Sequence, residues 1–159
     1  MVVIRCTQKL LRRMGPPVDT PPRSTTRLGD WYGNLLGVGH QRFALFVSEH
    51  CRLPVVLPAR DLKNAREHLI TALGIMLRAL GVSQSLIYEE LEEMADASVA
   101  RTVSRSLLGT LTDFGYALKW KVASIPEIDL VDLALYLSET PVGPMGYDSP
   151  RPAAQRIFA

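Results

Sequence analysis

Residues 101–106 combine hydroxyl and guanidinium side chains at the predicted start of a helix. The members best placed to contact a ligand are Arg101, Ser104, Arg105 and Ser106. The N-terminus of a helix presents unpaired N–H groups and the positive end of the helix dipole, so this segment could bind a phosphate group. The alternative is that Ser104 only caps the helix and that the two arginines pair with the acidic residues 89–93.

A second candidate site begins with Asp30 and Trp31 at the predicted start of a strand. Side chains alternate between the two faces of a strand, so Trp31 and Tyr32 would lie on opposite faces, and either could line a ligand pocket. Asp30 and Glu49 could hydrolyse a glycoside only if their carboxyl groups lay roughly 5 to 10 Å apart, a distance that the sequence does not determine. The alternative is that Trp31 belongs to the core and Asp30 ends a loop.

The thiols and imidazoles form no recognisable reactive or metal-binding motif. Cys51 follows His50, and a thiolate needs such a neighbouring base, but adjacent side chains of an extended chain diverge and a plain turn explains the segment. His40, His50 and His68 lack the spacing that preorganises zinc, so we predict no metal site and no cofactor. Cys6 and Cys51 exclude a disulfide scaffold, and two reduced thiols favour a cytoplasmic location.

Basic side chains are concentrated near the N-terminus, where Lys9, Arg12 and Arg13 could contact the phosphates of a nucleic acid. Residues 1–28 contain six basic side chains and one acidic, whereas residues 83–98 contain five acidic side chains and no basic one. The alternative is that these charges are solvated or pair within the molecule, which agrees with the mild formal net charge of +2. Binding to a single strand would also require aromatic side chains among the basic ones, and residues 1–28 contain none.

The first half of the chain predicts a sheet. Apolar and β-branched runs indicate four strands, at residues 2–4, 31–38, 42–47 and 53–57. A hairpin turn is expected between the second and third of them, and a short helix over residues 10–14 follows the first. Four prolines predict an exposed loop over residues 15–29.

The second half of the chain predicts helices. Candidate capping residues precede four segments with apolar side chains at helical spacing, and these residues are Asp61, Ser83, Ser104 and Asp129. Prolines predict an irregular C-terminal tail over residues 141–159. Strands followed by helices indicate an α+β fold, with a small antiparallel sheet of about four strands covered on one face by about four to five helices.

Length and composition agree with a single domain over residues 1–159. Hydrophobic residues make up 47% of the chain and charged residues 21%, as in an ordinary globular domain. The longest uncharged apolar stretch, residues 69–77, is less than half of the ~20 residues that a membrane-spanning helix needs. The N-terminus lacks the long apolar region of a signal peptide. We therefore expect a cytoplasmic protein with no membrane partner.

Four segments of the chain resemble those of one protein family. They are IRCTQKLL at residues 4–11, LGDWYGNLL at 28–36, SRSLLGTLTDF at 104–114 and TPVGPMGY at 140–147. In their order and spacing, they make the chain similar, nearly end to end, to an uncharacterised bacterial family, the domain-of-unknown-function family numbered 6933. The resemblance implies no activity, cofactor, partner or catalytic residue. Thr112 departs from the family pattern, in which asparagine often precedes the aspartate.

These observations predict a small non-catalytic binding or accessory module that forms a homodimer through an apolar helix or a sheet edge. Small genes of this kind are often carried on plasmids, so an association with mobile genetic elements is also expected. One alternative is an enzyme acting on a phosphorylated or nucleotide-like ligand, with Asp30 or Asp113 as acid or base. The other is nucleic-acid binding through the basic N-terminal residues. An anionic small molecule or a protein partner would suit the binding module.

Overall fold

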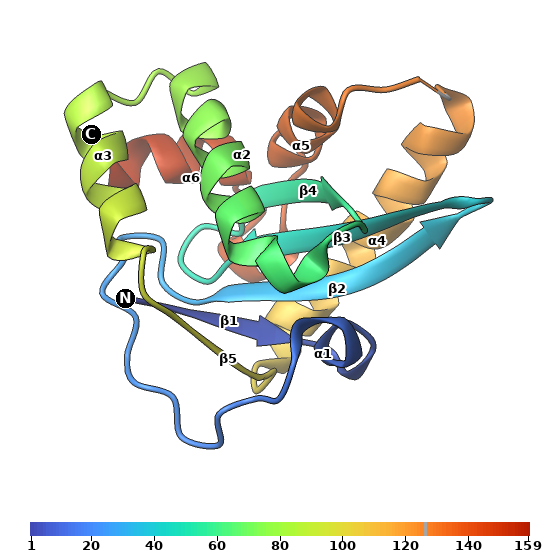
Figure 1. Ribbon diagram of the computed structural model, residues 1–159. Helices are drawn as coiled ribbons and strands as arrows, with labels where there is room; N and C mark the ends of the chain where they lie inside the picture. Colours follow the sequence, from blue (N-terminus) through green and yellow to red (C-terminus); the bar gives the residue numbers. More distant parts are fainter. Residues whose placement is uncertain (126) are drawn as a thin grey trace.

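The computed structural model describes residues 1–125 and 127–159, and a five-stranded sheet lies at its centre (Figure 1). The strands are β1 (Val2–Cys6), β2 (Trp31–Val38), β3 (Gln41–Ser48), β4 (Pro54–Pro58) and β5 (Ala97–Arg101). Their order across the sheet is β4-β3-β2-β1-β5. The strands β2, β3 and β4 form an antiparallel meander, whereas β1 lies parallel to both β2 and β5.

The α+β class is confirmed, but the sheet is mixed and has five strands instead of about four antiparallel ones. Parallel neighbours need a long crossover connection, and the helix α1 (Gln8–Met14) with the loop after it supplies that connection between β1 and β2. The fifth strand, β5, has the sequence ASVAR, which contains too few large apolar side chains to indicate a strand. It comes from the second half of the chain and pairs along its whole length with β1.

Six α-helices form in the described residues. They are α1, α2 (Ala65–Ala79), α3 (Gln84–Glu93), α4 (Arg105–Ser124), α5 (Leu130–Ser138) and α6 (Pro150–Ile157). The hydroxyl of Ser104 accepts a hydrogen bond from the Leu107 N–H, and the carboxylate of Asp129 accepts hydrogen bonds from the N–H groups of Val131 and Asp132. The caps predicted for α4 and α5 are therefore confirmed.

Two predictions about helices are wrong, one about the cap of α2 and one about the C-terminal tail. Asp61 does not cap a helix, because its φ of 53° is left-handed and a 3-10 turn, η1 (Leu62–Asn64), separates it from α2. The tail over residues 141–159, predicted to be irregular, contains the 3-10 turn η2 (Gly143–Met145) and the helix α6. The prolines of α6 fall in its first turn, where a missing N–H removes no hydrogen bond of the helix.

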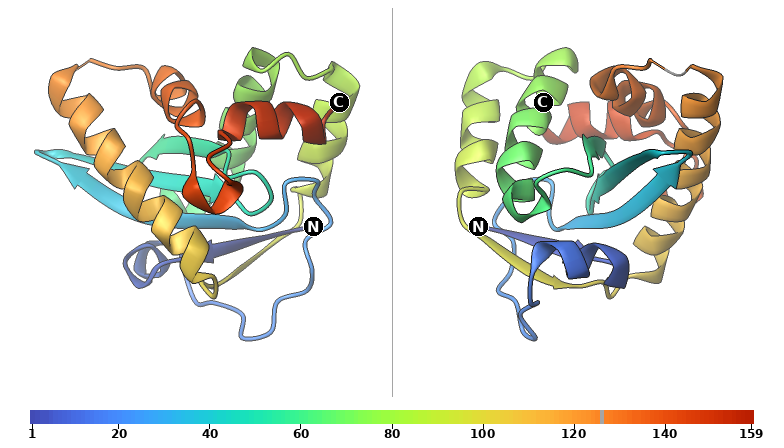
Figure 2. Two further views of the ribbon diagram at one scale, coloured as in Figure 1. Left: turned by 180° about the vertical axis from the view of Figure 1, so that it is seen from behind. Right: turned by 45° about the vertical axis from the view of Figure 1, so that its right-hand side comes forward.

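Helices cover both faces of the sheet, so the prediction of a single covered face is wrong. A Cβ added to Gly33 of β2 would meet the side chain of Leu10 in α1, whereas Leu36 of the same strand lies beside Gly115 in α4. Residues 33 and 36 point to opposite faces of a strand, so α1 and α4 lie on opposite sides of the sheet. Figure 1 shows α2 in front of the sheet, and the left view of Figure 2, from behind, shows α4 in front of it.

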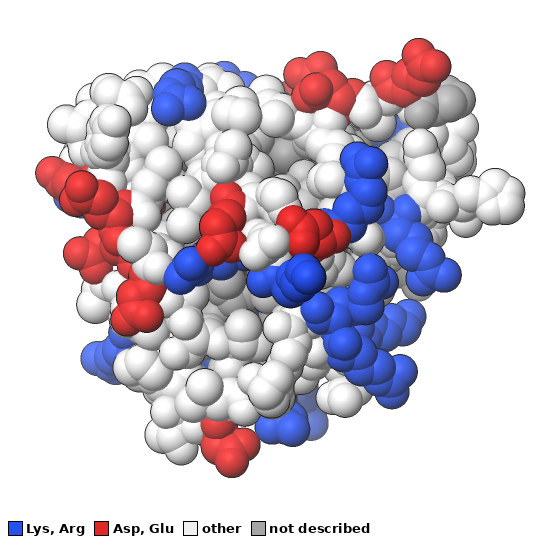
Figure 3. Space-filling view, viewed as in Figure 1, with Lys and Arg blue, Asp and Glu red and all other residues white. Residues whose placement is uncertain are grey.

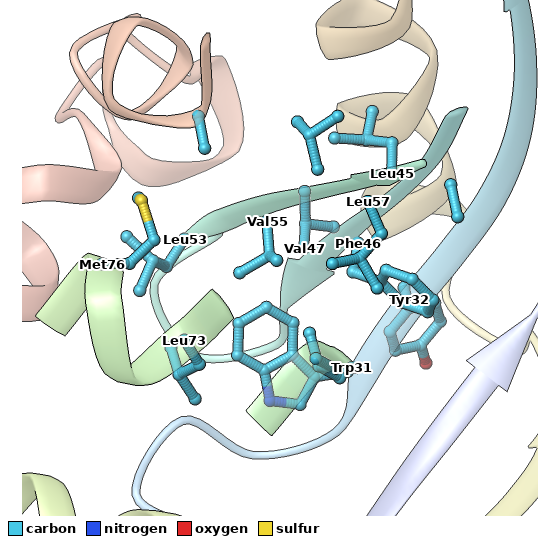
Figure 4. Packing of buried hydrophobic residues seen from close by; sticks show 14 of the residues in the cluster. Trp31, Tyr32, Leu45, Phe46, Val47, Leu53, Val55, Leu57, Leu73 and Met76 are labelled. Carbon is cyan, nitrogen blue, oxygen red and sulfur yellow. The ribbon is translucent and has the colours of Figure 1, made fainter. Parts of the chain in front are cut away.

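Trp31 lies inside the core on the same side of β2 as Gly33. Its side chain is fully buried, which confirms the interpretation of Trp31 as a core residue. Figure 4 shows the indole among apolar side chains of the neighbouring strands and of α2, including Val55 and Leu73. The indole Nε1 has no hydrogen-bond partner in the described part of the chain. Trp31 therefore contributes packing and is unavailable to a ligand at the surface.

The two cysteines are free thiols and both are buried. Burial raises the pKa of the Cys6 thiol to about 12, and it also raises the pKa of the Cys51 thiol. Neither residue has the accessible thiolate that nucleophilic catalysis requires. Among the described residues, no helix has both the length and the apolar character needed to cross a membrane.

Candidate functional site

The segment 101–106, which spans the end of β5 and the start of α4, does not form a single site. The guanidinium group of Arg101 lies 3.5 Å from the carboxylate of Asp19, and the hydroxyl of Ser106 accepts a hydrogen bond of 3.1 Å from Arg52. Arg105 is exposed. The predicted pairing of Arg101 with the acidic helix α3 is wrong, because β5 carries the chain across the sheet and away from that helix. Phosphate binding by this segment stays a prediction.

Asp30 lies in a polar cleft with residues that the sequence separates widely. Arg5 Nε lies 2.6 Å from Asp30 Oδ2, and the hydroxyl of Ser24 donates to Asp30 Oδ1 at 2.6 Å. The N–H of Asp30 donates to Glu49 Oε2 at 3.0 Å, so the structure does bring these two acidic residues together. The cleft has a volume of about 390 Å³ and is lined by Arg5, Pro21, Pro22, Arg23, Ser24, Gly29, Asp30, Glu49 and His50. Neither predicted arginine of the segment after β5 lines it.

The end of the proline-rich loop is held by a buried carboxylate on α3. Glu90 is 1% exposed and accepts hydrogen bonds from the N–H groups of Arg27, at 2.8 Å, and Leu28, at 3.1 Å. Burial raises the pKa of Glu90. Glu90 belongs to a run of acidic residues and is nevertheless buried, because the loop folds over that face of α3. The guanidinium of Arg27 also pairs with Glu89 at 3.0 Å, so charge pairing between the N-terminal segment and α3 is confirmed at this residue.

A cationic surface, here called the basic face, surrounds α1. Its side chains come from α1, β3, the segment after β4, η1 and α4, and they are Lys9, Arg12, Arg13, Arg42, Arg60, Lys63 and Lys119. Arg13 donates to the carbonyl oxygen of Ala59 at 3.5 Å, and the N–H of Ala59 donates to the carbonyl oxygen of Arg42, so α1 lies beside this part of the sheet. Figure 3 shows basic side chains gathered over α1 and the β2–β3 hairpin.

The basic face carries positive charge that carboxylates do not neutralise. None of its seven side chains forms an ion pair with another described residue. The interpretation that intramolecular pairing absorbs the N-terminal charges is therefore wrong for Lys9, Arg12 and Arg13. The folded chain brings these three residues together with four cations from later segments. The formal net charge of +2 conceals this concentration.

A groove opens at one side of the basic face because β2 is longer than β1. The strand β1 pairs with β2 only from Trp31 to Gly33, and beyond this point the chain leaves the strand to form α1. Residues 34–37 of β2 form the floor of a groove of about 190 Å³ between α1 and α4. It is lined by Lys9, Asn34, Leu35, Leu36, Gly37, Leu111, Thr112, Gly115, Tyr116 and Lys119. Two lysines thus stand on opposite walls of one groove.

Two exposed aromatic side chains on α4 stand next to these cations. Tyr116 lines the groove and is 69% exposed, and Trp120 is 74% exposed. Residues four positions apart lie on the same face of a helix, so the two rings form one aromatic surface beside Lys119. Sequence reasoning missed these residues because they lie more than 100 positions from Lys9. The exposed positions of an amphipathic α4 were the signal that could have found them.

The acidic residues and the histidine of the polar cleft do not form a metal site. Among the described residues, no group of three or more histidine, cysteine, aspartate or glutamate side chains is placed to hold a metal ion. His50 lies in the polar cleft, and its Nδ1 is 2.8 Å from the carbonyl oxygen of Arg27. His68 lies in α2, and its Nε2 is 3.3 Å from Asp61 Oδ2. Both residues line a hollow beside β4, which is separate from the polar cleft.

The fold is that of an α+β protein in which helices cover both faces of a mixed sheet. A groove lined by two lysines opens along the unpaired edge of β2. The chain belongs to the family described as Domain of unknown function (DUF6933), whose model matches residues 3–153. This match spans nearly the whole chain and confirms the family resemblance read from the four segments. No curated protein and no solved structure matches the chain.

Proposed function

We propose that this protein is a non-catalytic module that binds single-stranded nucleic acid on its basic face. The observation that carries the proposal is that cations without an ion-pair partner among the described residues lie beside two exposed aromatic rings of α4, of which Tyr116 lines the groove. Surfaces that bind single strands combine these two features, because cations attract the phosphates and aromatic rings stack on the bases. The proposal gives a ligand to the binding module expected from the sequence.

The cations supply the electrostatic part of the interaction. Each Lys or Arg that contacts a phosphate releases condensed counterions, which favours binding at low salt. A side chain that already pairs with a carboxylate contributes less, because its charge is neutralised. The basic face is free of such pairs among the described residues, from Lys119 across α1 to Arg60.

The aromatic rings account for the choice of a single strand. Stacking of a base on an aromatic side chain contributes about 1–3 kcal/mol, and only an unpaired, splayed base can reach such a ring. Tyr116 and Trp120 expose most of their surface to solvent and lie one helical turn apart, and contiguous exposed apolar surface is typical of interaction sites. Tyr116 lines the groove and Trp120 follows it one turn later on α4, so both rings would be accessible to the bases of a bound strand.

The enzyme alternative has weaker support. Asp30, the proposed acid or base, is engaged by the guanidinium of Arg5 and the hydroxyl of Ser24 inside the polar cleft. Its side chain and that of Arg5 are both largely buried. The arginines expected to orient an anionic ligand lie outside the cleft. The cleft therefore favours a structural ion pair over a catalytic acid.

The electrostatic part of the proposal is tested with a fluorescent oligothymidine and anisotropy measurements over a range of salt concentrations. The triple variant Lys9→Gln, Arg12→Gln, Arg13→Gln is expected to reduce the slope of log Kd against log salt by about 2, because each lost contact to a single strand removes about 0.7. Wild type that does not bind at low salt, or that binds duplex more tightly than single strand, would contradict the proposal.

A matched control removes the same charge from another surface. The triple variant Arg78→Gln, Arg151→Gln, Arg156→Gln alters residues of α2 and α6 and is expected to leave the slope unchanged. The aromatic part is tested by Trp120→Ala, which should weaken binding about tenfold through loss of stacking. Tyr88→Ala, which removes an exposed ring from α3, is the control and should have no effect.

A further inference from the structure

The floor of the groove is a strand edge with unpaired backbone groups. Just before β2, the carbonyl of Asp30 points toward β3 and accepts a hydrogen bond from the N–H of Glu49. Within β2, the carbonyl of Gly33 points to the opposite side, toward β1, and accepts a hydrogen bond from the N–H of Thr7. Backbone groups alternate between the two sides of a strand. Leu35 and Gly37 therefore direct their N–H and carbonyl groups away from β3 and toward the groove.

Two of these groups stay free at the centre of the edge. The side-chain oxygen of Asn34 accepts hydrogen bonds from the hydroxyl of Thr7, at 2.7 Å, and from the N–H of Leu35, at 2.9 Å. The carbonyl of Leu35 and the N–H of Gly37 have no partner within the described residues. They form an acceptor and a donor, side by side, between the lysine of α1 and the tyrosine of α4.

We infer that this edge binds the bases of the nucleic acid, through the carbonyl of Leu35 and the N–H of Gly37. The inference rests on the proposed function and adds which part of the nucleotide is recognised. An unpaired base offers donors and acceptors on its Watson–Crick edge, which proteins that read single strands hydrogen bond. In a duplex these groups are occupied by the complementary base. Lys9 and Lys119 hold the phosphates, Tyr116 stacks on the base, and the strand edge contacts its rim.

A peptide is the other ligand that strand edges bind, because its backbone can extend the sheet. The cations on both walls and the exposed rings of α4 favour a polyanion with aromatic bases over a neutral peptide. The experiment below distinguishes binding of an acidic peptide at this edge from binding of a nucleic acid.

The test compares two substitutions of Gly37. Gly37→Pro removes the N–H that faces the groove, and because this N–H does not pair with β3 the ladder between the strands is retained. Gly37→Ala keeps the N–H, and its Cβ would lie 3.9 Å from the nearest backbone atom, an ordinary contact. We expect Gly37→Pro to weaken binding of oligothymidine about fivefold, the effect of one lost hydrogen bond, with no change in the salt dependence. Gly37→Ala should bind like the wild type.

A second measurement avoids dependence on the folding of the proline variant. In the wild-type protein, the amide of Gly37 should exchange rapidly with solvent and become protected when oligothymidine binds, whereas an abasic oligomer of equal charge should give no protection. Equal binding by the two variants, or an unprotected Gly37 amide in the complex, would overturn the inference while leaving the proposed function intact. Wild type that binds no oligonucleotide refutes the proposed function itself. Weaker binding of oligoglutamate by Gly37→Pro than by Gly37→Ala, with equal binding of oligothymidine by the two variants, would assign the edge to an acidic peptide.

Discussion

At the scale of single residues, Glu90 connects the proline-rich loop to the helical layer. Its carboxylate accepts two backbone hydrogen bonds while being almost completely buried. The N–H groups of Arg27 and Leu28 would lose their partner if the carboxylate were removed. Because an unsatisfied buried donor costs more than an ordinary hydrogen bond contributes, this residue has a large influence on the stability of the loop.

We expect Glu90→Ala to lower the free energy of unfolding by about 2–6 kcal/mol, since each of two donors left without a partner costs about 1–3 kcal/mol. Urea denaturation monitored by circular dichroism measures the change. Glu92→Ala is the matched control, because Glu92 is an exposed residue of the same helix, and it should change stability little. Equal effects of the two substitutions would show that Glu90 does not hold the loop.

The raised pKa of Glu90 also predicts how stability depends on pH. Burial raises this pKa above the usual value of 4.5, so the folded protein binds the proton more tightly than the unfolded chain. The resulting stabilisation is complete below pH 4.5 and is lost as the pH rises through the raised pKa. The wild type should therefore lose stability relative to Glu90→Gln as the pH rises over this window, which urea titrations at several pH values measure. A difference that grows in the opposite direction would contradict this assignment.

At the scale of secondary-structure elements, two glycines that look similar in the sequence have different environments. Gly109 lies in α4, and a Cβ added there would meet open space. Gly33 lies in β2, and a Cβ added there would come within 2.5 Å of the ring of Phe46 and 2.8 Å of Leu10. Gly109 has this space because the outward face of α4 meets no other element at that position.

These environments predict opposite effects of the same substitution. Gly109→Ala should raise the free energy of unfolding by about 0.5–1 kcal/mol, because alanine loses less backbone entropy in a helix. Gly33→Ala should lower it by about 1–3 kcal/mol, because Phe46 and α1 must shift. Thermal and urea unfolding of both variants test this pair. Stabilisation by Gly33→Ala would mean that α1 does not pack on β2 as described.

The elements also show why the groove exists. β2 continues for five residues beyond the last one that pairs with β1, and α1 begins immediately after β1 ends. Strand length and helix position together leave an edge open between α1 and α4. The hydrophobic pattern of β2 does not show how much of the strand pairs with β1, because pairing also depends on where the partner strand ends.

At the scale of the whole molecule, the uneven charge distribution has a cost in stability. Seven like charges on one face repel each other, and no carboxylate within the described residues offsets them by direct pairing. A surface on which like charges lie close together, although their mutual repulsion lowers stability, is typical of a surface that binds an oppositely charged partner. The excess is hidden in the net charge, because α3 carries acidic residues on another side of the molecule.

Salt should therefore stabilise the free protein at low ionic strength. The screening length falls to about 10 Å at 0.1 M salt, which weakens repulsion between side chains on this face. We expect the melting temperature to rise between about 0.01 M and 0.1 M sodium chloride, and to rise less in the variant Arg12→Gln, Arg13→Gln. Differential scanning calorimetry measures both. An equal salt effect in the two proteins would place the repulsion elsewhere.

Local signals in the chain predicted much of the fold correctly. The helices α2 to α5, the caps Ser104 and Asp129, the β2–β3 hairpin and the burial of Trp31 all follow from the spacing of apolar residues and from short-range hydrogen bonds. Such features involve residues close in sequence, so their physical causes are visible there. The family membership was also recognisable, because its four segments keep their order along the chain.

Features that join distant residues emerged only on folding. The parallel pairing of β1 with β5, the ion pair between Arg5 and Asp30 and the burial of Glu90 each connect segments that the chain separates. The same holds for the groove, where Lys9 meets Tyr116 across the unpaired part of β2. Apolar spacing reports whether a side chain is buried but carries no information on which neighbour buries it or which strand edge stays free.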